Sequence, residues 1–266
     1  MKTIGVISIK GGVGKTSTVV SLGASMASLG KKVLLVDGNL SAPNLGMHIG
    51  LDAKKGVHDV LAGKIRPETA IYSHEVLDIM PASMFKAKAK NPLALKSKLK
   101  SLKKYYDVIL IDSSPALDNE TLAAMNASDE LIVVTTPDLP TLKTTMLAVK
   151  LAKEKKTPIK GLILNKVHNK NFEVNLADME KETGVPVLAV LPYDVNVLQA
   201  LAEKKPFPEY KKRAEGAQEY KKLAAALLGQ EYSGSRFKSW FNWFFGIKPK
   251  DHELNRICVY YESLFK

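Results

Sequence analysis

Lys10-Gly-Gly-Val-Gly-Lys-Thr-Ser17 is the stretch that decides the fold, and it stands between a β-branched run and the start of a helical pattern. Its glycines let backbone N–H groups turn inward around phosphate oxygens, and the helix N-terminus adds a partial positive charge. In such a loop the second lysine reaches the β and γ phosphates, and the hydroxyl that follows it binds Mg²⁺. An ordinary glycine-rich turn would need neither this spacing nor this context. The stretch therefore predicts a nucleoside triphosphate site made by Lys10, Gly11, Gly12, Val13, Gly14, Lys15, Thr16 and Ser17.

On either side of this loop, short apolar runs alternate with longer helical patterns. The runs cover residues 4–9, 32–37, 76–80, 108–112, 131–135, 161–165 and 187–191. Runs that are apolar at every position suit strands covered on both faces. We therefore expect an α/β fold with a mainly parallel, twisted sheet of about seven strands and helices on both faces. Ligands of such sheets bind at the carboxyl ends of the strands.

One acidic residue falls at the expected carboxyl end of a strand. Asp112 follows the apolar run Val108 to Ile111. A carboxylate there can hold a magnesium-bound water opposite Thr16. Strand-terminal aspartates are common, so it is the pairing with the loop that favours a metal role.

Three segments together resemble the deviant Walker A ATPases of the MinD/ParA family, and the MinD type most closely. They are the loop KGGVGKT at 10–16, Val36-Asp-Gly-Asn-Leu-Ser-Ala-Pro-Asn-Leu45, and Asp112-Ser-Ser-Pro115. The resemblance covers about the first 230 residues and implies a P-loop NTPase fold that hydrolyses ATP with Mg²⁺. It also implies an ATP-bound homodimer in which Lys10 reaches the partner's phosphates, Lys15 acts within its own site, and Asp37 joins Thr16 and Asp112 at the metal. Asn165 and the turn Pro192-Tyr193-Asp194 lie where the family cups the adenine.

The chain departs from the family pattern at one catalytic position. The family usually has Asp-x-Asp after the second strand, and this chain has Asp37-Gly38-Asn39. Asn39 cannot accept a proton, but its amide oxygen can orient a water molecule. We therefore expect slow hydrolysis rather than none, with a nucleotide-binding partner that scarcely turns over as the alternative.

Composition sets further limits on function. The formal net charge is +12, which favours anionic partners without choosing among phosphate ligands, lipid and nucleic acid. The single cysteine, Cys258, excludes an internal disulfide and a CxxC centre within one chain, and it argues against an iron–sulfur carrier. We see no signal-peptide pattern and no apolar run of roughly 20 residues. The expected place is the cytoplasm, peripheral on the inner face of the cell membrane.

The expected domain organisation is an ATPase domain at 1–230, a linker at 231–235, an amphipathic helix at 236–250 and a tail of unknown structure at 251–266. Projected as a helix, the third segment gathers Phe237, Trp240, Phe241, Phe244 and Ile247 on one face. With its basic flanks this pattern suits a helix lying on an anionic membrane. The alternative is a terminal helix docked on the core of the body. MinD-type proteins carry a C-terminal membrane-targeting helix, which this segment resembles.

Two other stretches allow more than one interpretation. The tail can form a helix with an apolar face at Leu254, Ile257, Cys258, Tyr261 and Leu264, or an added strand around residues 259–261. We expect Cys258 to be buried rather than a reactive thiol. For the lysine-rich stretch 86–104 we favour a helix with one solvated face, and the alternative is a contact with lipid or DNA phosphates.

The expected function is a MinD-like membrane switch that positions division or other cell-surface machinery through a protein cargo or activator that the sequence does not identify. The alternative is a ParA-like partitioning ATPase that binds DNA nonspecifically, for which an aromatic interfacial helix is not needed. DNA binding of that kind falls steeply with salt.

Overall fold

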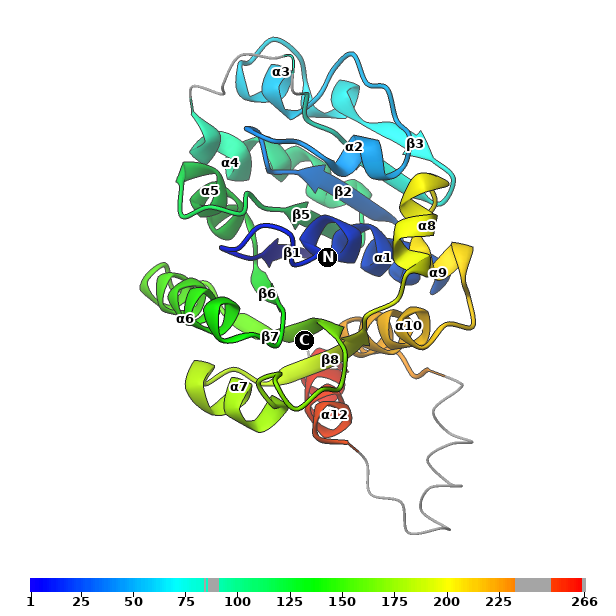
Figure 1. Ribbon diagram of the computed structural model, residues 1–266. Coiled ribbons are helices and arrows are strands. Elements are labelled where there is room, and N and C mark those ends of the chain that lie inside the picture. Colours follow the sequence, from blue (N-terminus) through cyan, green and yellow to red (C-terminus); the bar gives the residue numbers. More distant parts are fainter. Residues whose placement is uncertain (84, 86–90, 233–249, 265–266) are drawn as a thin grey trace.

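The computed structural model describes residues 1–83, 85, 91–232 and 250–264. Its centre is an eight-stranded sheet in the order β3-β4-β2-β5-β1-β6-β7-β8. Seven strands run parallel, and β3 pairs antiparallel with β4 at one edge. The expected fold class is confirmed, with one more strand than the sequence indicated. Figure 1 shows the helices on both faces of this twisted sheet.

The strands lie close to the predicted runs. Their bounds are β1 Lys2–Ile7, β2 Val33–Asp37, β3 Tyr72–His74, β4 Leu77–Met80, β5 Val108–Asp112, β6 Glu130–Thr135, β7 Ile159–Val167 and β8 Val187–Pro192. The first strand ends two residues before the predicted end, so Ser8 and Ile9 belong to the segment that connects β1 to the phosphate loop. The added strand β3 is short and half exposed, which left no apolar run to reveal it.

The helices have the following bounds: α1 Lys15–Ser28, α2 Leu45–His48, α3 Val57–Leu61, α4 Leu95–Leu99, α5 Asn119–Ala127, α6 Leu139–Glu154, α7 Leu176–Thr183, α8 Asn196–Ala202, α9 Phe207–Tyr210, α10 Glu215–Leu227 and α12 Asp251–Leu264. Short 3₁₀ helices are η1 Pro67–Ala70, η2 Pro92–Ala94 and η3 Lys100–Tyr105. Gly229, with φ +62°, follows the end of α10, a place where helices commonly end in a glycine.

The core lies on both faces of the sheet because successive residues of each strand point to opposite sides. In β5, Val108 and Leu110 join the cluster under α1 and α10, whereas Ile109 and Ile111 join the cluster on the other face. All are buried. This two-sided burial explains why the strands are apolar throughout. Because seven strands are parallel, their carboxyl ends lie at the same end of the sheet, which is where the candidate site lies.

Residues 251–264 form the helix α12, which resolves the choice between helix and strand in the tail. It packs against β8 and α10 (Figure 1). The helix turns His252, Arg256 and Val259 inward, and Cys258 is exposed. The expectation of a buried cysteine was therefore wrong. The periodicity located an apolar face correctly, but it did not show that the opposite face, held by buried polar contacts, is the one that turns inward.

Those contacts centre on a buried ion pair. Arg256 donates to the carboxylate of Glu219 on α10 and, at 3.2 Å, to the carbonyl oxygen of Leu188 on β8. Glu219 also pairs with Lys222 at 2.6 Å. Burial opposes ionisation of Glu219, but Arg256 and Lys222 together lower its pKa below the ordinary value. The ionised state of the buried Glu219 carboxylate therefore depends on α12, for which the sequence left both helix and strand open.

We expect Arg256→Ala to lower the free energy of unfolding by about 3 kcal/mol, because it leaves a buried carboxylate with one partner fewer. Urea unfolding of the purified protein measures this change. Arg66→Ala, which removes an exposed arginine, is the matched control and should change the free energy by less than about 0.5 kcal/mol. Equal losses in the two variants would contradict the assignment.

The lysine-rich stretch is described in part. Leu95, Leu99 and Leu102 are buried, as the predicted one-sided helix requires, whereas Leu93 is exposed. Lys103 lies 3.1 Å from Asp129 and Lys104 lies over the ring of Tyr105. Lys86, Lys88 and Lys90 lie outside the described residues, as do the membrane-face residues Phe237, Trp240, Phe241, Phe244 and Ile247. Among the described residues, no helix is both long and apolar enough to cross a membrane.

Candidate nucleotide site

The loop between β1 and α1 has the conformation that a phosphate cradle needs. Gly12 and Gly14 have φ values of +79° and +90°, which other residues rarely adopt. A Cβ at Gly14 would also lie 2.3 Å from the side-chain nitrogen of Asn165. At Gly11 nothing lies within 4 Å of the corresponding position, so the loop faces open space. The helix α1 begins at Lys15 and directs its N-terminus at this space.

Asp112 holds the two side chains that the sequence assigned to phosphate and metal. It accepts a bond from Lys15 Nζ at 2.8 Å and one from Thr16 Oγ1 at 2.6 Å. Asp112 is fully buried and Lys15 nearly so. The strand register explains this meeting, because Asp112 ends β5 next to β1, which leads into the loop. Lysine, threonine and aspartate are thus gathered at one point.

A second buried carboxylate lies beside the first. Asp37 ends β2 and stands opposite Asp112 in the parallel register. It accepts backbone N–H groups from Asn39 and Leu45, both at 3.1 Å. Burial, followed by the nearby charge of Asp112, raises the pKa of Asp37 well above its ordinary value. Each carboxylate makes ionisation of the other less favourable, and a divalent cation bound between them would offset this repulsion.

Asn39 contributes a buried acceptor without a partner. Its side-chain nitrogen donates to the carbonyl oxygen of Ala42. Its oxygen Oδ1 is buried and has no hydrogen-bond partner among the described residues, and Asn39 lines the same cavity as the phosphate loop. A buried amide oxygen is costly to leave unpaired. This orphaned oxygen therefore fits a water molecule or a ligand group in the nucleotide site.

Lys10 is paired with residues at the start of helix α6. Its amino group donates to Asp138 Oδ1 at 3.0 Å and to Thr141 Oγ1. Asp138 caps α6 by accepting the N–H of Thr141 at 2.9 Å. Burial opposes ionisation of Asp138, yet hydrogen bonds from Thr136, Thr141 and Lys10 lower its pKa to about 2. The ion pair is therefore present at neutral pH, and its side chains are about 40% exposed.

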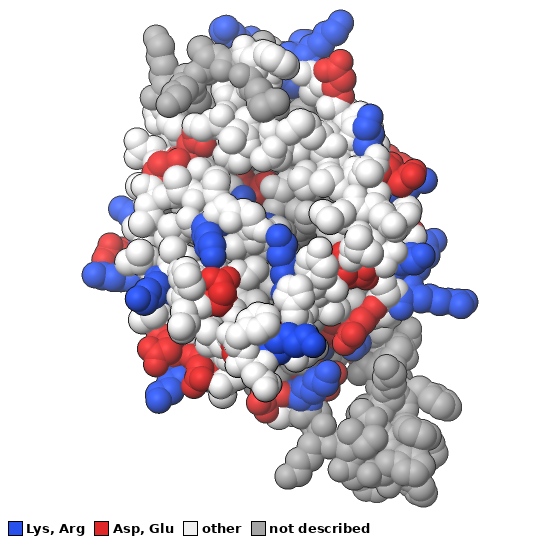
Figure 2. All heavy atoms as spheres, viewed as in Figure 1, with Lys and Arg blue, Asp and Glu red and all other residues white. Residues whose placement is uncertain are grey.

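The residues predicted to cup the adenine line a cavity of about 400 Å³ that the phosphate loop also lines. Pro192 ends β8, and Tyr193 and Asp194 follow it. Asn165 donates to the carbonyl oxygen of Val13 at 2.7 Å. Tyr193 stacks on His168 with ring centroids 4.8 Å apart. In Figure 2, which shares the view of Figure 1, a hollow opens near the middle of the surface, and basic and acidic side chains are interspersed around it.

Two residues of this site were missed by sequence reasoning. Lys166 donates to the carbonyl oxygen of Gly12 at 2.7 Å, so it and Asn165 tie the end of β7 to the loop. Lys166 has φ +58°, a conformation that sequence does not reveal. Asp138 was readable as a helix cap from its position before Leu139-Pro140-Thr141. Its contact with Lys10, 128 residues away, was not.

The donor set fits a nucleoside triphosphate with Mg²⁺. Inward-turned glycines, a buried lysine, a hydroxyl and a strand-terminal carboxylate stand where a P-loop protein holds phosphate and metal. Asn39 Oδ1, which has no hydrogen-bond partner among the described residues, adds an acceptor for a polar ligand group or a water molecule. Fold and site together define a P-loop nucleotide-binding protein.

Comparisons with known proteins agree. A family profile described as an AAA domain matches residues 1–159. An uncharacterized ATP-binding protein of Methanocaldococcus jannaschii is 33% identical over 233 residues, which cover 86% of this chain and 88% of that protein. The septum site-determining protein MinD of Synechocystis is 28% identical over 240 residues, 86% of this chain and 90% of that protein.

Among solved structures, MinD of Pyrococcus horikoshii complexed with Mg-ADP superposes with a TM-score of 0.80 and 35% identity, covering 84% of this chain and 94% of that one. The cell division ATPase MinD of Pyrococcus furiosus gives 0.80 and 34%, with coverage of 84% and 96%. The chain belongs to the MinD/ParA family of P-loop ATPases.

Proposed function

We propose that this MinD-like ATPase binds ATP with Mg²⁺, dimerises when ATP is bound, and attaches to the inner face of the cell membrane through residues 236–250. In that place it positions division or other cell-surface machinery. The observation that carries the nucleotide part is the buried cluster of Lys15, Thr16 and Asp112. A relative with 35% identity is described in complex with Mg-ADP.

The roles of the side chains follow from their places. Lys15 would bind the β and γ phosphates, and Thr16, with Asp112 and Asp37, would hold the metal ion. Mg²⁺, when bound, supplies positive charge that offsets charge developing on the phosphates. Asn39 would orient the attacking water through its free oxygen without accepting a proton, so turnover would be slow. Asn165, Pro192, Tyr193 and Asp194 would hold the base.

Exposed apolar side chains support a dimer at the carboxyl edge of the sheet. They sit in the segments that follow β5, β6, β7 and β8, and all are more than half exposed: Leu117, Leu139, Phe172, Tyr193 and Leu198. Those segments leave the sheet at the same end, and two of these side chains, Tyr193 and Leu198, line the nucleotide cavity itself. A second subunit docked there would bury them and bring its Lys10 toward the phosphates of the first.

Within one chain Lys10 is paired with Asp138, so the contact of Lys10 with a partner's phosphates must break this pair. We expect Asp138→Asn to raise ATP turnover by up to about fivefold, because an exposed ion pair is worth roughly 1 kcal/mol or less and asparagine caps a helix as well as aspartate. Steady-state ATP hydrolysis measures it. Asp178→Asn, a substitution in the first turn of α7, is the control. Turnover below the parental rate would show that Asp138 supports catalysis instead.

Membrane attachment is tested by sedimentation with vesicles containing anionic lipid, in ATP, in ADP and without nucleotide. A truncation after residue 235 is unsuitable, because it removes α12 and the partner of buried Glu219. The informative variant is Phe241→Asp with Phe244→Asp, and Val76→Asp with Phe85→Asp is the control, both of its targets being exposed and outside the proposed dimer surface. Pelleting that needs ATP and Phe241 and Phe244 supports the proposal. Binding to DNA that falls with salt, without pelleting, would favour the partitioning alternative.

A further inference from the structure

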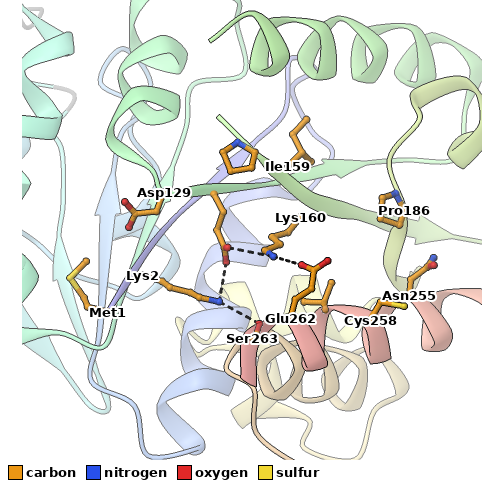
Figure 3. A pocket seen from close by; sticks show the side chains of 13 residues that line it. Met1, Lys2, Asp129, Ile159, Lys160, Pro186, Asn255, Cys258, Glu262 and Ser263 are labelled. Carbon is orange, nitrogen blue, oxygen red and sulfur yellow. Dashed lines mark hydrogen bonds and ion pairs between the residues drawn. The ribbon is translucent and has the colours of Figure 1, made fainter. Parts of the chain in front are cut away.

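The helix α12 is fixed on the body by its inward face, so the direction of its outward face is also fixed. Figure 3 shows Lys160 of β7 directed at Glu262 and Lys2 of β1 directed at Ser263, at 2.6 and 3.4 Å. These contacts line a cavity of about 910 Å³ between α12 and the amino ends of the strands. Asn255 donates to Val187 O at 2.9 Å, which adds an anchor to the buried Arg256.

The outward face of α12 carries an apolar stripe. Leu254, Ile257, Tyr261 and Leu264 are each between 45 and 55% exposed. Their spacing of three, four and three residues is that of the a and d positions of a helix–helix seam. A row of large apolar side chains on a rigid surface helix indicates a surface that another element covers. We call these four residues the α12 stripe.

The segment just before α12 has the same spacing. Phe237, Trp240, Phe244 and Ile247 also follow one another at three, four and three residues. Only residues 248–250, which include Pro249, separate this pattern from α12. Connections of two to five residues are usual between antiparallel neighbouring helices.

The two patterns match in register when the chain folds back on itself. In an antiparallel pair, Ile247 falls opposite Leu254, Phe244 opposite Ile257, Trp240 opposite Tyr261, and Phe237 opposite Leu264. Every apolar position of one segment thus meets one of the other, with no insertion. We propose that the α12 stripe is the docking surface for residues 237–247 of the same chain, paired as an antiparallel helical hairpin.

Charge favours this occupant over others. The charged side chains of α12 other than buried Arg256 are acidic: Asp251, Glu253 and Glu262. Residues 236–250 contain Arg236, Lys238, Lys248 and Lys250 and no acidic residue. In the proposed register Lys248 lies opposite Glu253. An anionic lipid surface or the α12 of a second copy would instead meet like charge.

The chain supplies its own reporter, because both of its tryptophans, Trp240 and Trp243, lie in the proposed partner segment. Tryptophan emission is recorded without lipid or nucleotide, together with quenching by acrylamide. We expect the parent to show blue-shifted emission and protection from acrylamide, and Ile257→Asp with Tyr261→Asp to lose both. Val76→Asp, which changes an exposed residue before β4 at the opposite edge of the sheet, should leave both unchanged. Identical spectra and quenching in parent and stripe variant would overturn the proposal.

The single cysteine gives a second, independent readout. Cys258 is next to Ile257 and exposed among the described residues. If residues 237–247 dock on the stripe, they shield it, so the rate of alkylation by a maleimide should rise in Phe244→Asp. Phe85→Asp is the control and should react at the parental rate. Equal rates in all three proteins would also overturn the proposal.

Docking on the stripe and attachment to lipid use the same aromatic face, so the two compete. Ile257→Asp with Tyr261→Asp is therefore expected to bind anionic vesicles more tightly than the parent. This last readout alone rests on the proposed membrane function. Changed emission with no vesicle binding by either protein would keep the docking surface and reject membrane attachment.

Discussion

Lys10→Gln is expected to lower ATP turnover by about 10³-fold while leaving nucleotide affinity close to that of the parent. A cation that reaches the γ-phosphate from the partner stabilises charge that is greater in the transition state than in the ground state. Affinity is retained because Lys15, Thr16 and the loop backbone are unchanged. Single-turnover hydrolysis and binding of a fluorescent ATP analogue measure the two quantities. Lys64→Gln, an exposed lysine elsewhere, is the control.

Mixing two inactive variants decides whether Lys10 acts across the dimer. Lys15→Gln removes the charge from the phosphate site but keeps a donor for buried Asp112. In a mixed dimer with Lys10→Gln, one site has Lys15 of its own and Lys10 of the partner. Turnover should therefore return in part when excess Lys15→Gln is added. No recovery, with mixed dimers present, would mean that Lys10 acts within its own subunit.

The phosphate loop was predictable because its signal is local. Glycines at fixed spacing, a lysine and a hydroxyl all lie within eight residues, and the apolar runs around them specify buried parallel strands. Asp112 needed one step more, since its meeting with Lys15 and Thr16 depends on β5 lying next to β1. That neighbourhood is the usual arrangement in the fold, so family resemblance supplied it.

Contacts between distant polar residues were not predictable. The apolar pattern of α12 predicted one face with Leu254, Ile257 and Cys258, and Cys258 was expected to be buried. The residues that turn inward include His252 and Arg256 instead. Their burial depends on Glu219, which lies on another helix and gives no sign of it in sequence. The contact between Lys10 and Asp138 in the nucleotide site was unpredictable for the same reason, because the two residues are far apart in the sequence. Periodicity reports which residues share a face, but only tertiary structure decides which face turns inward.

Asn39→Asp is expected to raise ATP turnover by roughly 10²-fold, because a carboxylate can both orient the attacking water and accept its proton. The position is already suitable, since Asn39 Oδ1 is buried, belongs to a residue that lines the nucleotide cavity, and has no hydrogen-bond partner within the described part of the chain. Asn44→Asp is a matched control, because Asn44 lines the same cavity and also donates to Ala42 O, at 3.0 Å. It should not accelerate hydrolysis.

The same substitution should also change stability in a direction that depends on the ligand. It places a third carboxylate beside Asp37 and Asp112, both fully buried. Without a cation, like charges in a buried site oppose folding, so the Tm of the ligand-free variant should fall. Mg²⁺ with a non-hydrolysable ATP analogue should then raise its Tm by more than it raises that of the parent. A variant that is destabilised, regains stability with the ligand and yet hydrolyses no faster would show that the amide is not what limits turnover.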